Sequence, residues 1–272
     1  MIENNKNQLI LFFDIDGTII DSFNGNSIIS DLLREAFRQL KENGHLCFIA
    51  TGRPLAYLND EILSIDFDGF VLCNGAIVIK DQQVIKESLF PKDVVSSLVH
   101  IMDKNNNVYF LNYLKEVYFS KNGIEQNELF GNEVIENGII YHEYDLNNIK
   151  VAKIEINNLE EKTTTYLKKM QALGYEVVWY PGLDYAEITM PHATKGEAIK
   201  QVLKLLDISR DNSIAFGDGD NDIEMLKVVG HGVAMGNGSK SVKEVADMIT
   251  DTCLNEGIVK ELQRLGLVKN II

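Results

Sequence analysis

The sequence LILFFDIDGT (residues 9–18) runs from five apolar residues directly into two aspartates, a glycine and a threonine. The apolar run predicts a buried β-strand. Asp14 and Asp16 follow it immediately, although burying carboxylates is costly unless they are paired or bound to a metal. This stretch therefore predicts a core strand whose carboxyl end carries a functional site.

Strands and helices alternate in the first and last thirds of the chain. The predicted helices are 27–42, with Ile28 on its buried face, one beginning at Pro54, 195–206 capped by Thr194, and 222–229, with two further helical stretches near the end. The predicted strands after the first are LCFIA (46–50), FVLC (70–73), SIAFG (213–217) and GVAMG (232–236). Strands that are apolar throughout, alternating with helices, predict a parallel sheet covered on both faces.

The middle of the chain has a different pattern. Helices are predicted near 92–104 and 159–173, and strands at VYFL (108–111), VAKIEI (151–156), YEVVWY (175–180) and AEITM (186–190). Several of these strands alternate apolar and polar residues, which is typical of a half-exposed antiparallel sheet. We therefore predict an α/β protein with a Rossmann-like parallel-sheet core, residues 1–82 and 192–272, and an inserted α+β cap, residues 83–191.

Composition and charge narrow the possible partners. With 26 basic and 40 acidic side chains the net charge is −14, which disfavours nucleic acids and anionic membrane surfaces as partners. The apolar stretches are too short to span a membrane. Three widely spaced cysteines, Cys47, Cys73 and Cys253, predict reduced thiols rather than a disulfide framework or a metal site. We expect a cytoplasmic protein that is a monomer or a weak homo-oligomer.

Four unusual stretches fall where predicted strands end or helices begin: DIDGT (14–18), TGR (51–53), ATKG (193–196) and GDGDND (217–222). In open α/β sheets the ligand site lies at the carboxyl ends of the strands. The aspartates offer hard oxygen ligands that suit Mg²⁺. Lys195, Thr51 and the backbone amides near Gly52 offer donors for a phosphate. Together these groups are the minimum apparatus for phosphoryl transfer.

The order of these four motifs resembles that of the haloacid dehalogenase-like superfamily, and the inserted module resembles the cap of its Cof-type sugar-phosphatase branch. The resemblance covers nearly the whole chain, including CNGA (73–76), AMGN (234–237) and NEGIVKEL (255–262). It implies a Mg²⁺-dependent phosphatase that acts on sugar phosphates or similar small phosphomonoesters, with the cap setting substrate specificity.

The resemblance also implies roles for individual residues. Asp14 would be the nucleophile that forms an aspartyl-phosphate, and Asp16 the general acid and then base. Thr51 and Lys195 would bind the transferring phosphoryl group, and Gly52 and Asn221 would contact phosphate or water. Mg²⁺ would be held by the Asp14 carboxylate, the backbone carbonyl of Asp16 and Asp218, with Asp222 as outer support.

Some interpretations stay open at this point. Arg53 either touches substrate or pairs with a local carboxylate. Asn74 either touches substrate or only forms a tight turn with Gly75. Trp179, Tyr180 and Tyr185 are interpreted as cap core rather than as a platform for a sugar ring, and His192 is the one histidine expected near the site. A phosphosugar mutase, and with less weight a non-catalytic sensor of phosphorylated ligands, are the alternative functions.

Overall fold

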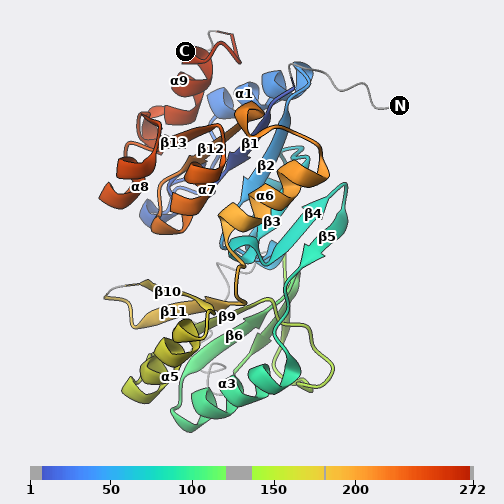
Figure 1. Ribbon diagram of the computed structural model, residues 1–272, viewed down its shortest axis with the longest axis vertical. Coiled ribbons are helices and arrows are strands. Elements are labelled where there is room, and N and C mark those ends of the chain that lie inside the picture. Colours follow the sequence, from blue (N-terminus) through green and yellow to red (C-terminus); the bar gives the residue numbers. More distant parts are fainter. Residues whose placement is uncertain (1–7, 121–136, 181, 270–272) are drawn as a thin grey trace.

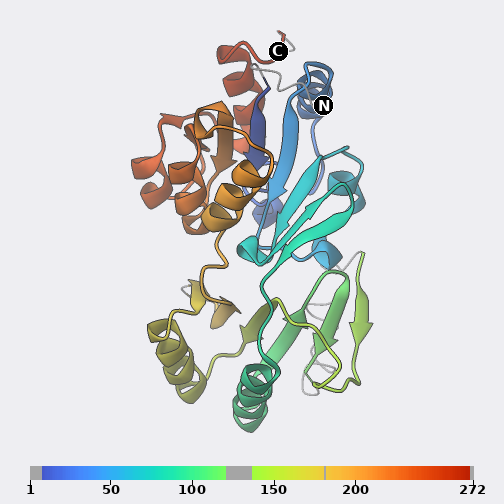
Figure 2. The ribbon, with the colours of Figure 1, turned by 45° about the vertical axis from the view of Figure 1, so that its right-hand side comes forward.

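The computed structural model describes residues 8–120, 137–180 and 182–269. Two parts are stacked along the long axis, a core built from both ends of the chain and a cap built from its middle (Figure 1). Two connections join them, one after strand β5 and one before helix α6 (Figure 2). The α/β core with an inserted cap, predicted from the sequence, is confirmed.

The core contains an eight-stranded sheet in the order β14-β13-β12-β1-β2-β3-β4-β5. The strands from β14 to β3 are parallel, and β4 and β5 are antiparallel to their neighbours. Their bounds are β1 Ile10–Phe13, β2 Leu46–Ala50, β3 Gly69–Leu72, β4 Ile77–Lys80, β5 Gln83–Glu87, β12 Ser213–Gly217, β13 His231–Ala234 and β14 Met248–Ile249. The first quoted strand, β1, lies near the centre, between β12 and β2.

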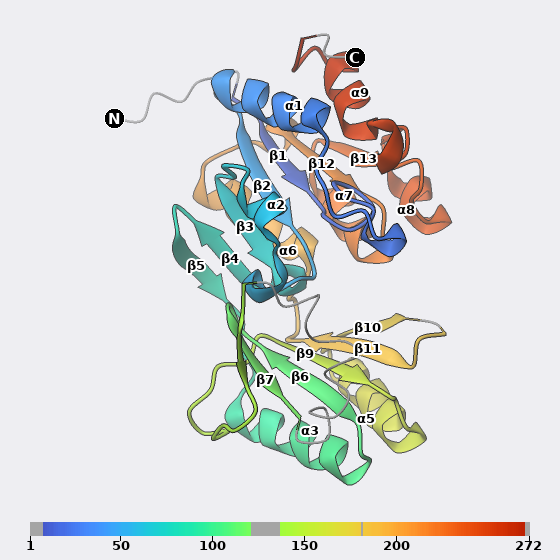
Figure 3. The same cartoon turned by 180° about the vertical axis from the view of Figure 1, so that it is seen from behind.

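Helices cover both faces of this sheet. Side chains alternate along β1, so that Leu11 and Phe13 pack toward α1 and α9, whereas Ile10 and Phe12 pack toward α6 and α7. Figure 1 shows the face of the sheet that α6 and α7 cover. Figure 3, the view from behind, shows the opposite face, which α1 and α9 cover. The core helices are α1 Asp31–Glu42, α2 Asp60–Leu63, α6 Lys195–Leu205, α7 Ile223–Val228, α8 Lys240–Val245 and α9 Gly257–Arg264.

Two predicted helix starts are wrong. Helix α1 begins at Asp31 rather than at residue 27, because Ser30 is its N-cap and its Oγ accepts a hydrogen bond from the Leu33 amide at 3.1 Å. Ile28 therefore precedes the helix, and it is 68% exposed instead of buried. Pro54 does not open an α-helix; it precedes a single 3₁₀ turn, Leu55–Tyr57.

A hairpin that the sequence analysis missed extends the core sheet. Strands β4 and β5 are joined by Asp81 and Gln82, which both have positive φ, 48° and 62°. Two-residue hairpin turns of this kind usually carry Asn-Gly or Asp-Gly, so Asp-Gln gives little signal in the sequence. The predicted boundary between residues 82 and 83 falls inside this hairpin, because the core sheet continues to Glu87.

The cap is a six-stranded sheet in the order β10-β11-β9-β6-β7-β8, antiparallel except for the pair β7 and β8. Two helices pack on its outer face, away from the core (Figure 3). The bounds are α3 Lys92–Lys104, α5 Glu161–Ala172, β6 Val108–Asn112, β7 Glu116–Phe119, β8 Ile139–Tyr141, β9 Lys153–Asn157, β10 Glu176–Tyr180 and β11 Tyr185–Thr189.

The core covers part of the inner face of the cap sheet. Val108, Phe110, Val117 and Phe119 pack against Ala56 and Tyr57 of the core. The half-exposed sheet predicted for the cap is therefore wrong for strands β6 and β7, which helices cover on one face and the core on the other, whereas β8 and β10 keep exposed or partly exposed side chains. Among the residues that the structure describes, no helix is long and apolar enough to cross a membrane.

Phe13 provides a test of the core. Its ring stacks on Phe216 at a centroid distance of 5.2 Å and meets Phe37 edge-on at 5.1 Å. We expect Phe13→Ala to lower the free energy of unfolding by about 3–5 kcal/mol in urea denaturation, because it leaves a cavity under the sheet. Leu173→Ala, at a side chain that is 76% exposed, is the control and should change it by less than about 0.5 kcal/mol.

The three cysteines are free thiols, as predicted. Burial raises the pKa of Cys73 to about 12 and also raises that of Cys47, while Cys253 is only partly buried. Because the thiolate is the reactive form, we expect Cys47 and Cys73 to resist a thiol reagent at pH 8 in the native protein and all three to react after unfolding. Rapid native reaction of two or more thiols would contradict this burial.

Candidate active site

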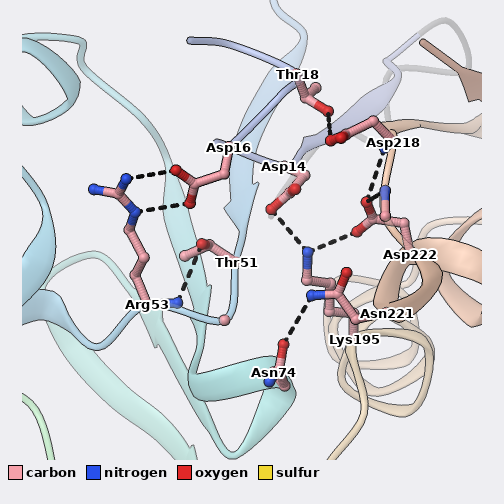
Figure 4. A network of polar contacts seen from close by, with 12 residues as sticks. Asp14, Asp16, Thr18, Thr51, Arg53, Asn74, Lys195, Asp218, Asn221 and Asp222 are labelled. Carbon is pink, nitrogen blue, oxygen red and sulfur yellow. Dashed lines mark hydrogen bonds and ion pairs between the residues drawn. The ribbon is translucent and has the colours of Figure 1, made fainter. Parts of the chain in front are cut away.

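Segments from four distant parts of the sequence converge at the carboxyl end of the core sheet (Figure 4). Asp14 follows β1 and Asp218 follows the neighbouring strand β12, so the sheet brings their loops together. Gly17 turns the first loop with φ +77°, and a Cβ there would lie 2.2 Å from Asp218 Oδ2. This explains glycine in DIDGT, because any larger residue would collide with the Asp218 carboxylate.

Lys195 is the first residue of α6, and its side chain is buried among carboxylates. Its Nζ donates to Asp14 Oδ1 at 2.8 Å and to Asp222 Oδ1 at 2.6 Å. The Thr194 side chain caps the helix by accepting from the Glu197 amide. At Gly75, a Cβ would lie 2.1 Å from the Thr194 carbonyl oxygen, so the glycine lets the loop after β3 approach the start of α6 closely.

Asp222 serves the loop that carries Asp218. Its Oδ2 accepts hydrogen bonds from the backbone amides of Asp218 and Gly219, at 2.9 and 3.0 Å, and its Oδ1 accepts from Lys195. Both carboxylate oxygens are thus engaged. This arrangement fits a supporting position next to a metal better than a direct ligand position.

The carboxylates of Asp14, Asp218 and Asp222 form a cluster that suits a divalent cation. Ligand oxygens from all three lie within 4.8 Å of one another. Burial raises the pKa of Asp14 strongly, and Asp222 raises it further despite the opposing charge of Lys195. Burial and then Asp222 raise the pKa of Asp218 to about 7. A cation at this point would offset the repulsion that raises both values, and carboxylate oxygens are the ligands that Mg²⁺ prefers.

Asp16 lies beside Asp14 but faces a different partner (Figure 4). Arg53 donates to it through two nitrogens, at 2.8 and 2.5 Å, and the Ser22 hydroxyl also donates to it. Burial alone would raise the pKa of Asp16, but the hydrogen bonds and charge of Arg53 outweigh it, so the pKa is lowered. Arg53 is thus paired with a carboxylate of the site, and its contact with substrate stays a prediction.

Four more of the predicted site residues lie around the carboxylates: Thr51, Gly52, Asn74 and Asn221. Thr51 is buried after β2, and its Oγ1 accepts from the Arg53 amide at 3.2 Å. Asn221 donates to the Asn74 side-chain oxygen at 3.1 Å, and Asn74 donates in turn to Glu187 of the cap at 2.9 Å. In this arrangement Asn74 links core to cap, while Thr51, Gly52 and Asn221 line the cleft above Asp14.

A cleft of about 660 Å³ lies between core and cap over these residues. Asp14 and Asp16 both line it, as do the aromatic side chains of Tyr57, Trp179, Tyr180 and Tyr185. Trp179 also packs against the cap core, so its position agrees in part with both interpretations of the aromatic cluster. His192 is exposed and does not line the cleft.

Sequence reasoning missed the charged residues on the cap side of this cleft. Lys153, Glu155 and Glu187 line it, and each is at least nine-tenths buried. Lys153 and Glu155 are alternate residues of β9, and Glu187 of β11 pairs in register with Glu155. The charges in KIE (153–155) were a signal for this cluster, but alternation alone also fits a solvent-facing strand.

Comparison with known proteins agrees with this geometry. The sequence-family model that describes the haloacid dehalogenase-like hydrolases matches residues 11–262 of this chain. The chain belongs to this family. It is 26% identical to the 5-amino-6-(5-phospho-D-ribitylamino)uracil phosphatase YcsE of Bacillus subtilis, covering 93% of this chain and 94% of that one. It is also 26% identical to the phosphoglycolate phosphatase of Archaeoglobus fulgidus, covering 94% and 96%.

Solved structures of the family have the same architecture. The sugar phosphatase BT4131, of subclass IIB of the haloacid dehalogenase superfamily, superposes with a TM-score of 0.82 at 27% identity, covering 96% of this chain and all of that one. The phosphatase BT1666 of Bacteroides thetaiotaomicron gives 0.80 at 25% identity, covering 98% and 99%. The predictions of family and enzyme class, a hydrolase of the phosphatase type, are confirmed.

Lys195 provides a test of the buried charge cluster. We expect Lys195→Met to lower the free energy of unfolding by about 3–5 kcal/mol, because it leaves Asp14 and Asp222 buried without their cation. The matched control is Lys200→Met on the same helix, where the lysine is exposed and pairs with Glu197. That change should cost about 0–1 kcal/mol in the same chemical denaturation experiment. Equal effects of the two variants would contradict the assignment.

Proposed function

We propose that the protein is a Mg²⁺-dependent phosphatase that hydrolyses sugar phosphates or similar small phosphomonoesters through an aspartyl-phosphate on Asp14. The observation that carries this proposal is the convergence of Asp14, Asp16, Lys195 and Asp218 at one end of the core sheet, around a cleft. The family membership and the phosphatase relatives support the same activity.

In the first step, an Asp14 carboxylate oxygen attacks phosphorus, and the bond from phosphorus to the leaving oxygen breaks. Lys195 holds Asp14 through Oδ1, which leaves Oδ2 without a hydrogen bond from a described residue and available to attack. Asp16 gives its proton to the leaving oxygen. Because Arg53 lowers the pKa of Asp16, Asp16 must take up a proton before this step.

In the second step, water hydrolyses the aspartyl-phosphate. Asp16, ionised again, accepts a proton from the attacking water, and Asp14 and inorganic phosphate are released. Thr51, Gly52 and Asn221 line the same cleft and would donate hydrogen bonds to the phosphoryl group. The third hydrogen of Lys195 Nζ is available to it as well, because the other two are bound to Asp14 and Asp222.

Mg²⁺ would be held by Asp14, Asp218 and the backbone carbonyl of Asp16, with Asp222 in support. When bound, it supplies positive charge that balances the carboxylates and the incoming phosphate. No observation on the described residues favours phosphate migration within a substrate over phosphate release. The cytoplasmic location and the monomeric or weakly homo-oligomeric state stay predictions from the sequence.

The test is phosphate release from a panel of sugar phosphates and other phosphomonoesters. We expect Asp14→Asn to lower kcat by about 10³-fold or more, since the amide cannot act as the nucleophile. A chelator should abolish release by the wild type, and added Mg²⁺ should restore it. Asp211→Asn, an exposed aspartate outside the cleft, is the control for the same change and should retain activity.

Three results would count against the proposal. Metal-independent turnover would contradict the role of Mg²⁺. Full activity of Asp14→Asn would contradict the assignment of Asp14 as the nucleophile. Phosphate migration without release would favour a mutase instead.

A further inference from the structure

Three charged side chains of the cap form a buried cluster over the catalytic groups, which we call the cap charge cluster: Lys153, Glu155 and Glu187. They are 1%, 6% and 7% exposed, and all three line the same cleft as Asp14 and Asp16. The mechanism above does not use them. Burying three charges is costly, so their position at the place where a leaving group would lie calls for an explanation.

The lysine of the cluster has no hydrogen left for a ligand. An ammonium group has three donors. Lys153 Nζ lies 2.8 Å from the Gly52 carbonyl oxygen, 3.0 Å from Glu187 Oε1 and 2.5 Å from Glu155 Oε1. A second anionic group on a substrate would therefore have to displace one of these carboxylates or the backbone carbonyl to reach Lys153.

The other basic residue among the described residues that line the cleft is also engaged. Arg53 donates to Asp16 through two nitrogens and to the Tyr57 carbonyl oxygen through the third, at 2.9 Å. Lys195, beneath Asp14, is placed for the transferring phosphate and not for the leaving group. The leaving-group side of the cleft thus presents no cation that is ready to pair with an anion.

The carboxyl groups of the cluster, in contrast, can still accept hydrogen bonds. A carboxylate has about four lone-pair sites. Glu187 accepts from Lys153, from the Tyr185 hydroxyl at 2.9 Å and from Asn74 at 2.9 Å, and Glu155 accepts from Lys153 and from the Tyr57 hydroxyl at 3.3 Å. Two carboxyl groups around one ammonium leave no net positive charge, whether or not Glu155 carries a proton.

We propose that the cap charge cluster selects phosphomonoesters whose leaving group is uncharged and hydroxylated, and discriminates against those that carry a second anionic group. Hydroxyl donors find acceptors on Glu155 and Glu187, whereas a carboxylate or a second phosphate meets like charge and no available cation. This inference rests on the proposed phosphatase function and assigns Glu155 and Glu187 as its specificity-determining residues.

The experiment compares two substrates that differ in one group. Glycerol 3-phosphate and 3-phosphoglycerate have the same carbon skeleton, but the second carries a carboxylate in place of a hydroxymethyl group. We expect wild-type kcat/KM to be at least tenfold higher for glycerol 3-phosphate, with Mg²⁺ in excess. p-Nitrophenyl phosphate serves as a general phosphomonoester that reports whether the chemistry works at all.

Two variants test the assignment to the cluster. Glu187→Gln and Glu155→Gln keep the size of the side chain and remove its charge. In each variant the ratio of kcat/KM for glycerol 3-phosphate to kcat/KM for 3-phosphoglycerate, which we call the preference, should fall at least threefold. The matched control is Glu161→Gln on α5, an exposed glutamate that does not line the cleft, and its preference should equal that of the wild type. Because there are two variants, the test stands if one of them fails to fold.

Each result bears on a different statement. Equal rates on the pair, or a preference for 3-phosphoglycerate, would overturn the inference while p-nitrophenyl phosphate turnover keeps the phosphatase function. A wild-type preference that neither glutamine variant changes would also overturn it. No release from any of the three compounds would overturn the proposed function, and this inference with it.

Discussion

The ion pairs of Lys195 hold the candidate active site together. One buried ammonium group joins Asp14 at the end of β1 to Asp222 beyond β12, and it does so from the first residue of α6. Asp222 in turn orients the backbone that carries Asp218. Without this cation three carboxylates would be crowded into a poorly solvated space, so the positions of Asp14 and Asp222, and of the Asp218 loop that Asp222 orients, depend on it.

The cap completes the site through a second buried cation. Lys153 contacts the carbonyl of Gly52, which belongs to the loop that carries Thr51 and Arg53, and Glu187 contacts Asn74. The groups that would bind the phosphoryl group and the groups that would contact the leaving group are therefore in direct contact. A shift of the cap relative to the core would change both sets of groups together.

The sequence analysis succeeded where signals were local. An apolar run ending in DIDGT predicts both a central strand and the position of its carboxylates, and Thr194 marks the start of α6. It failed where the structure departs from common local patterns. Ile28 fits a helical face but precedes the Ser30 cap, and the turn Asp81–Gln82 adopts positive φ without glycine.

By itself, the sequence determined the family, the α/β core with its inserted cap, and the residue types available for chemistry, because apolar periodicity and short motifs depend on near neighbours in the chain. Only the tertiary structure decided which of these groups touch. Alternating charges on β9 suit either solvent or a buried face, and the choice depends on the core, which covers that face and turns Lys153, Glu155 and Glu187 into a wall of the cleft. Likewise only the fold brings Asp16, 37 positions earlier in the chain, within hydrogen-bonding distance of the Arg53 guanidinium group.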